Sequence, residues 1–143
     1  MSRRDKGHFG NKHEGVPLDE TIAAELRRKA RSGGLSCAEA EGIAGKMKAA
    51  MKDIGVAMDL LEIRIEGCQL GLFGYESGKK AVKPLGHVSE ALWLSIEKAL
   101  SDGRLPCRDA WRIAGEQGLP RKDVSSACEA MGIKISACQL GAF

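Results

Sequence analysis

Residues 63–73 of the chain read IRIEGCQLGLF, and residues 133–143 read IKISACQLGAF. The two stretches lie 70 residues apart, and the same offset aligns the segments before them without a gap. Over 19–73 and 89–143 the alignment contains 18 identical residues in 55 positions. Self-similarity at a fixed spacing is the sequence signature of a repeated structural unit. The chain is therefore predicted to contain one supersecondary unit twice.

The composition of the 143-residue chain is that of an ordinary globular protein, with 43% hydrophobic and 29% charged residues. Units this small bury only about 60% of their unfolded surface, so we expect the two copies to pack together. No stretch approaches the roughly 20 apolar residues that a membrane helix needs, and the N-terminus lacks the apolar run of a signal peptide. We therefore expect a cytoplasmic protein with no membrane partner.

The net charge of +3 is unevenly placed. Residues 1–18 have four basic and two acidic side chains, and residues 74–88 have three basic and one acidic. The first copy has eight basic and nine acidic residues, and the second has seven of each. The excess positive charge thus lies outside the two copies, whereas a nucleic-acid-binding domain commonly has a basic face of its own.

Helical spacing and caps predict three helices in each copy. In the first copy they begin at Asp19 or Thr21, near Ser36 and near Ala50, and an alternating strand follows at 62–66. The second copy repeats this order, with Ser89 as a cap and prolines opening its later helices. The predicted fold class is mainly α, with two tandem three-helix units, each followed by a short strand or small hairpin. The predicted domains are a flexible basic arm (1–18), the first repeat (19–73), a linker (74–88) and the second repeat (89–143).

Five positions between 109 and 127 form a pattern of their own: Ala114, Gly118, Leu119, Val124 and Ala127. They provide a small residue where two helices cross, a turn glycine, an apolar residue after it and two apolar positions on the second helix. This pattern resembles the helix-turn-helix of DNA-binding proteins, including winged-helix domains. The resemblance implies that 120–131 is a recognition helix and that the partner is DNA. The residues it places against DNA are Arg121, Lys122, Ser125 and Ser126, together with Arg112 on the preceding helix.

The first copy departs from this pattern. Ala44 is in place, but Lys48 stands where the second copy has Gly118, so we predict a blurred turn and a degenerate unit. Its helix face contains Met51 and Lys52 and is poor in base-reading groups. It is interpreted as a scaffold, or as the surface through which a homodimer or partner protein binds.

Two arrangements remain open for the strands. The strand after the third helix and the Cys-Gln-Leu-Gly-x-Phe segment could form the hairpin of a winged helix. Alternatively, the Ile-x-Ile strands of the two copies could pair with each other.

The cysteines offer a weak metal-site hypothesis. Four of the five are retained as pairs at the 70-residue offset, Cys37 with Cys107 and Cys68 with Cys138. No C-x-x-C spacing is present, and cysteine is among the most buried residue types, so packing thiols are favoured over a zinc or redox site. No cofactor is predicted, and His8 and His13 are interpreted as solvated.

No arrangement of acid, base or nucleophile emerges from the sequence, so no enzymatic activity is expected. The leading hypothesis is a transcriptional regulator that reads DNA with the second repeat. The alternative is a protein-interaction or dimerisation module on the same scaffold without DNA binding. A thiol-based metal or redox sensor is the weaker alternative.

Overall fold

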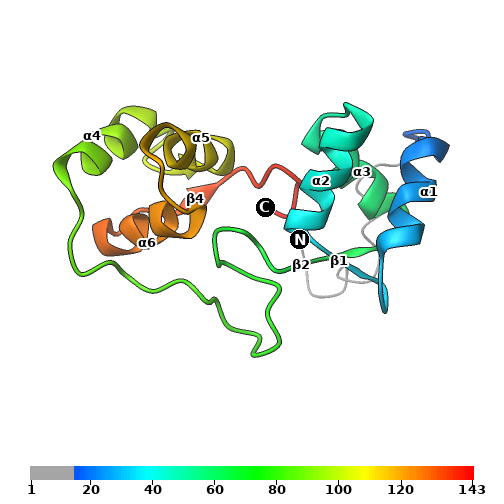
Figure 1. The fold of residues 1–143 in the computed structure, drawn as a ribbon, viewed down its shortest axis with the longest axis horizontal. Helices are drawn as coiled ribbons and strands as arrows, with labels where there is room; N and C mark the ends of the chain where they lie inside the picture. The colour runs from blue at the N-terminus through cyan, green and yellow to red at the C-terminus, as the bar shows by residue number, and fades with distance from the viewer. Residues whose placement is uncertain (1–14) are drawn as a thin grey trace. The chain divides into compact units, whose positions relative to one another are not determined.

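The computed structural model describes residues 15–143, and these form six α-helices and four short strands (Figure 1). The order helix, strand, helix, helix, strand occurs twice. The first set is α1 (Glu20–Lys29), β1 (Gly34–Ser36), α2 (Cys37–Met47), α3 (Met51–Leu60) and β2 (Arg64–Glu66). The second set is α4 (Glu90–Ala99), β3 (Leu105–Pro106), α5 (Cys107–Gln117), α6 (Arg121–Met131) and β4 (Ile135–Ser136). The predicted mainly helical fold and its repetition are confirmed, while most of the predicted arm, with His8 and His13, lies outside the described residues.

The backbone repeats more closely than the sequence does. Six left-handed positions in the first copy have a left-handed counterpart 70 residues later. Glycine occupies both members of only two of these pairs. The pairs are Ser32/Asp102, Gly33/Gly103, Lys48/Gly118, Glu62/Gly132, Gly67/Ala137 and Gly71/Gly141. Because non-glycine residues rarely adopt this conformation, its recurrence shows that the two copies follow the same backbone path.

The helix starts follow the predicted caps, with two small differences. Asp19 accepts hydrogen bonds at the start of α1, and Ser36 forms a capping box with Glu39 at the start of α2. Pro106 and Pro120 are the N-cap residues of α5 and α6 rather than their first helical residues. Both prolines have ψ of 143°, an extended value, so each helix begins one residue later than predicted.

Each copy contains a two-stranded parallel sheet. β1 pairs with β2 in the register Leu35↔Ile65, and β3 pairs with β4 in the register Leu105↔Ile135. The expected hairpin and the expected pairing between copies are therefore both wrong. The two helices between the strands form the long crossover that a parallel pair requires, and the partner strand is the short segment before the second helix.

The retained Cys-Gln-Leu-Gly-x-Phe segment forms a closed loop in both copies instead of a returning strand. In the first copy the Cys68 amide donates to the Phe73 carbonyl at 3.1 Å, and the Cys138 amide donates to the Phe143 carbonyl at 3.0 Å in the second. The leucine of each loop, Leu70 or Leu140, is almost fully buried. The buried leucine therefore gives the most similar segment of the repeat a structural role in each copy.

The chain divides into two compact units between Gly67 and Cys68, so the units do not coincide with the sequence repeats. Residues 68–73 belong to the first repeat in sequence but pack within the second unit. Cys68 and Leu70 join its hydrophobic core, which is built mainly from α4, α5 and α6. We call residues 68–88 the strap; it precedes α4 and contacts α6 (Figure 1).

In the first unit, ion pairs connect α1 and α2. Glu25 Oε2 lies 3.0 Å from Arg28 Nη2 on its own helix and 3.2 Å from Lys46 Nζ on α2. The hydrogen bonds from Arg28 and then Lys46 lower the pKa of the Glu25 carboxyl to about 2.

None of the helices in the described part of the chain is long and apolar enough to cross a membrane.

Candidate nucleic-acid interface

The turn between α5 and α6 has the geometry expected of its residues. Gly118 ends α5 in the left-handed conformation, with φ 65° and ψ 34°. The Leu119 amide then donates to the Ala114 carbonyl at 2.9 Å, which closes the end of the helix. Ala114 is 2% exposed, and Val124 and Ala127 are fully buried. The five positions of the pattern therefore hold the two helices in close contact.

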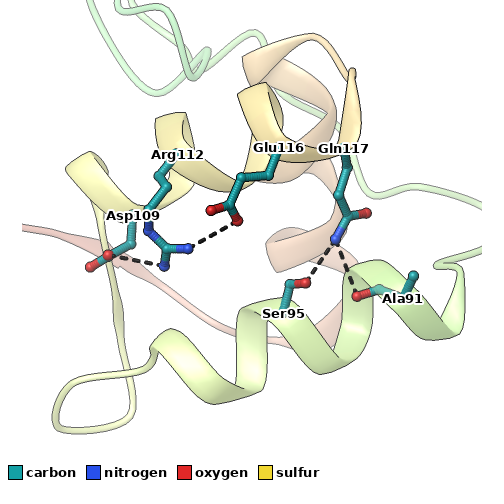
Figure 2. Close-up of polar contacts among 6 residues, drawn as sticks. All are labelled: Ala91, Ser95, Asp109, Arg112, Glu116 and Gln117. Atoms are coloured by element: carbon teal, nitrogen blue, oxygen red, sulfur yellow. Dashed lines mark hydrogen bonds and ion pairs between the residues drawn. The ribbon is translucent and has the colours of Figure 1, made fainter.

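Arg112, predicted to approach DNA, is held by carboxylates of its own helix (Figure 2). Its guanidinium lies 3.3 Å from Asp109 Oδ1 and 3.1 Å from Glu116 Oε1. The pKa of Arg112 is raised, mainly by its hydrogen bond to Asp109. Since two acidic groups offset its charge, Arg112 contributes little net positive potential to this surface.

Gln117, at the end of α5, connects α5 to α4. Its Nε2 donates to Ser95 Oγ at 2.7 Å and to the Ala91 carbonyl at 3.3 Å (Figure 2). These bonds orient the helix that precedes the turn.

The structure brings Arg121 and Lys122 together at the start of α6, beside the strap. The Arg121 guanidinium stacks 3.8 Å from the centre of the Trp111 ring and donates to Gln69 Oε1 at 2.9 Å. Lys122 is exposed, and its Nζ lies 5.8 Å from the Tyr75 ring centre. Arg121 is thus engaged by the protein itself, whereas Lys122 faces solvent.

Ser125 and Ser126 are only 1% and 9% exposed, so their side chains do not form an outward face. They belong to a run of five consecutive buried residues, 124–128. Five residues span more than one full helical turn, so the middle of α6 has no solvent-exposed side. The strap covers part of it: the Leu85 amide donates to the Ser126 carbonyl at 3.1 Å.

Glycine is required where the strap approaches α6. Gly71 has φ +77°, and a Cβ at this position would lie 3.0 Å from both Lys122 Cε and the Val82 amide nitrogen. The Ala81 and Val82 amides both donate to the Gly71 carbonyl. Farther along the strap, Lys80 Nζ forms an ion pair with Glu129 Oε1 at 2.6 Å. The strap is therefore held to α6 at both ends of the helix.

The first copy retains the turn although glycine is absent from it. Lys48 adopts φ 53° and ψ 40°, and the Ala49 amide donates to the Ala44 carbonyl at 2.9 Å. The blurred turn predicted from the sequence is therefore not observed. The first copy differs from the second in backbone strain at this turn, because a residue with a side chain, Lys48, adopts a conformation that side chains disfavour. On the face predicted for a partner, Met51 is half-buried and Lys52 is exposed.

All five cysteines are free thiols, and four of them are buried; Cys138 is partly exposed. Burial raises the pKa of the Cys128 thiol to about 12. No group of three or more potential metal ligands occurs among residues 15–143. Cys37, Cys68 and Cys107 of the two retained pairs are thus buried, and the role of the pairs as packing thiols stays a prediction.

Two residues that hold Arg121 are absent from the sequence-based prediction. Gln69 lies 52 positions away in the first repeat, and Trp111 lies on α5, seven residues or about two turns before Gly118. Glutamine occurs at this position in both copies, as Gln69 and Gln139, which marks the position as important. Its partner Arg121, however, is replaced by Met51 at the equivalent position of the first copy. The repeat therefore gives no indication of this pairing.

No protein-family model, curated protein or solved structure matches this chain.

Proposed function

We propose that this chain is a helix-turn-helix-type scaffold used for protein–protein interaction. The observation that carries the proposal is the burial of the whole middle of α6, which a groove-reading helix would have to expose. The tight glycine turn between α5 and α6 supports the scaffold resemblance. The neutral balance of charge in each copy also supports a protein partner over a polyanion.

An exposed apolar surface on α4 supports this proposal. Trp93 is 44% exposed and Leu94 is 48% exposed, and they are adjacent on the outer side of the helix. The matching positions in the first copy are Ala23 and Ala24. Trp is enriched at the energetic centres of protein interfaces, so an exposed indole present in only one copy favours a contact surface there.

The charges around Trp93 indicate the chemistry of the partner. Trp93 Nε1 donates to Glu97 Oε1 at 2.8 Å, and Glu90 is also exposed on this helix. The proposed partner is therefore a protein surface with an apolar recess for the indole and basic side chains opposite the two glutamates.

Site-specific photo-crosslinking in cells tests this surface. A photoreactive residue at position 94 is expected to yield one discrete protein adduct, and Trp93→Ala in the same chain should abolish it. The matched control is the same photoreactive residue at Ala24, which is exposed at the equivalent position. Sedimentation of the purified chain distinguishes a second copy from another protein. Equal labelling at positions 24 and 94, or labelling that survives Trp93→Ala, contradicts the proposal.

DNA binding is the second candidate, favoured by the exposed Lys122 beside Arg121 and by the net charge of +2 within 74–88. Reading DNA with α6 requires the strap to leave the helix. Gly71→Ala, which crowds Lys122 and Val82, should then strengthen DNA retention relative to the unsubstituted chain. Arg121→Ala and Lys122→Ala should weaken it.

A filter-binding assay at about 50 mM and about 200 mM salt measures this effect, because phosphate contacts weaken steeply with salt. Gly78→Ala is the control, because it alters a strap glycine that has open space around it. Absence of DNA retention at the lower salt by both the unsubstituted chain and Gly71→Ala excludes this candidate.

A further inference from the structure

A cavity of about 580 Å³ lies in the second unit, between the strap, the second half of α6 and the end of the chain. Its walls are largely apolar and include Leu72, Cys128 and Ile135. Phe73 and Phe143 also line it, and their rings meet edge to face with centres 6.1 Å apart. Apolar cavities of 300–1,000 Å³ with a few placed polar groups are typical of small-molecule sites.

The polar groups of this cavity are few and unevenly satisfied. Ser125 lines it, and the buried Ser125 Oγ has no hydrogen-bond partner in the described structure. Buried hydroxyl groups normally have a partner, so an unpartnered hydroxyl on a residue of the cavity wall points to a bound molecule as the missing partner. Lys80 and Glu129 are paired with each other at 2.6 Å. Lys134 is exposed and forms no ion pair within the part of the chain that the structure describes.

We propose that this cavity binds a small aromatic carboxylate. The aromatic body would pack against the phenylalanine pair and the apolar walls, which favour an aromatic ligand. Its carboxylate would bind Lys134, because the charge of the other lysine of the cavity, Lys80, is already offset by Glu129. The proposal concerns a ligand of the second unit and does not depend on either proposed function.

The first copy lacks the corresponding polar group. Ser125 corresponds to Gly55, which has no hydroxyl, and Cys128 corresponds to the bulkier Met58. The site is therefore specific to the second unit, although the two copies share one backbone path.

Isothermal titration calorimetry with three matched probes tests the proposal on the full chain. The probes are 1-naphthylacetate, the neutral 1-naphthylacetamide and the cationic 1-naphthylmethylamine. We expect 1-naphthylacetate to bind with a stoichiometry of one, and the other two probes to bind roughly tenfold more weakly, because a charge-assisted hydrogen bond is lost. Equal affinity for all three probes, or no binding of 1-naphthylacetate, overturns the proposal.

Two variants connect binding to the named groups. Lys134→Gln should reduce the affinity for 1-naphthylacetate to that of the amide, and Ser125→Ala should weaken it several-fold. Ser125→Ala should also leave the melting temperature of the unliganded chain unchanged or higher, because it removes an unsatisfied buried hydroxyl. Ser126→Ala is the matched control, since Ser126 does not line the cavity. Unchanged affinity in both Lys134→Gln and Ser125→Ala places the probe elsewhere and refutes the site.

Discussion

The two copies provide a reciprocal test of backbone strain at equivalent positions, Gly118 and Lys48. Both residues hold a left-handed conformation at the end of the second helix of their copy, with φ of 65° and 53°. A Cβ added at Gly118 would meet no atom within 4 Å, so Gly118→Ala changes backbone preference without a steric clash. The strain of a side chain in this conformation is about 1–2 kcal/mol, but alanine also lowers the conformational entropy of the unfolded chain, which offsets about 0.5–1 kcal/mol. The net cost of the substitution should therefore be roughly 0.5–1 kcal/mol.

Lys48→Gly relieves the same strain but increases the conformational entropy of the unfolded chain. The relief of about 1–2 kcal/mol is offset by about 0.5–1 kcal/mol, so we expect a net stabilisation of roughly 0.5–1 kcal/mol. The two substitutions should therefore shift the free energy of unfolding in opposite directions.

Urea unfolding measures both effects, and the spectroscopic signals separate the units. Both tryptophans, Trp93 and Trp111, lie in the second unit, so their fluorescence reports on that unit, whereas far-ultraviolet circular dichroism reports on all helices. With a denaturant slope of about 1–2 kcal/mol per molar, Gly118→Ala should lower the fluorescence midpoint by roughly 0.3–1 M. An unchanged midpoint in Gly118→Ala, or a loss of stability in Lys48→Gly, would refute the reasoning.

Three further predictions concern charge, thiols and the helix contact. The pKa of Glu25 is about 2 in the folded chain against an ordinary 4.5, so the stabilisation by its ion pairs is present above about pH 4.5 and is lost as the pH falls toward 2. Thermal melts at several pH values in this range should therefore show a smaller loss of stability for Glu25→Gln than for the unsubstituted chain. Alkylation of the native chain with iodoacetamide should label Cys138 first and Cys128 last, as mass spectrometry would show, and elemental analysis should find no stoichiometric zinc. Gln117→Ala should lower the free energy of unfolding by about 1 kcal/mol because it removes the bonds to α4, and an unchanged urea midpoint would contradict this.

Local sequence was enough to predict most of the helices. Asp19, Ser36 and Ser89 are the observed N-caps, because a capping side chain binds backbone amides only a few residues away. Gly118 was likewise predictable as a left-handed turn residue. Lys48 was not, because its side chain gives no local reason for that conformation.

The sequence by itself determined that one unit occurs twice, because the 70-residue offset is visible in the residues alone. Only the tertiary structure decided that β2 and β4 pair in parallel with the segments before α2 and α5, since parallel pairing depends on where a long crossover returns the chain. It also decided that Ser125 and Ser126 are buried and that Arg121 binds Gln69. The helical pattern predicts which face of α6 is polar, but the strap that covers part of this helix arrives from more than 40 residues earlier in the chain, and contacts at such separation leave no local signal.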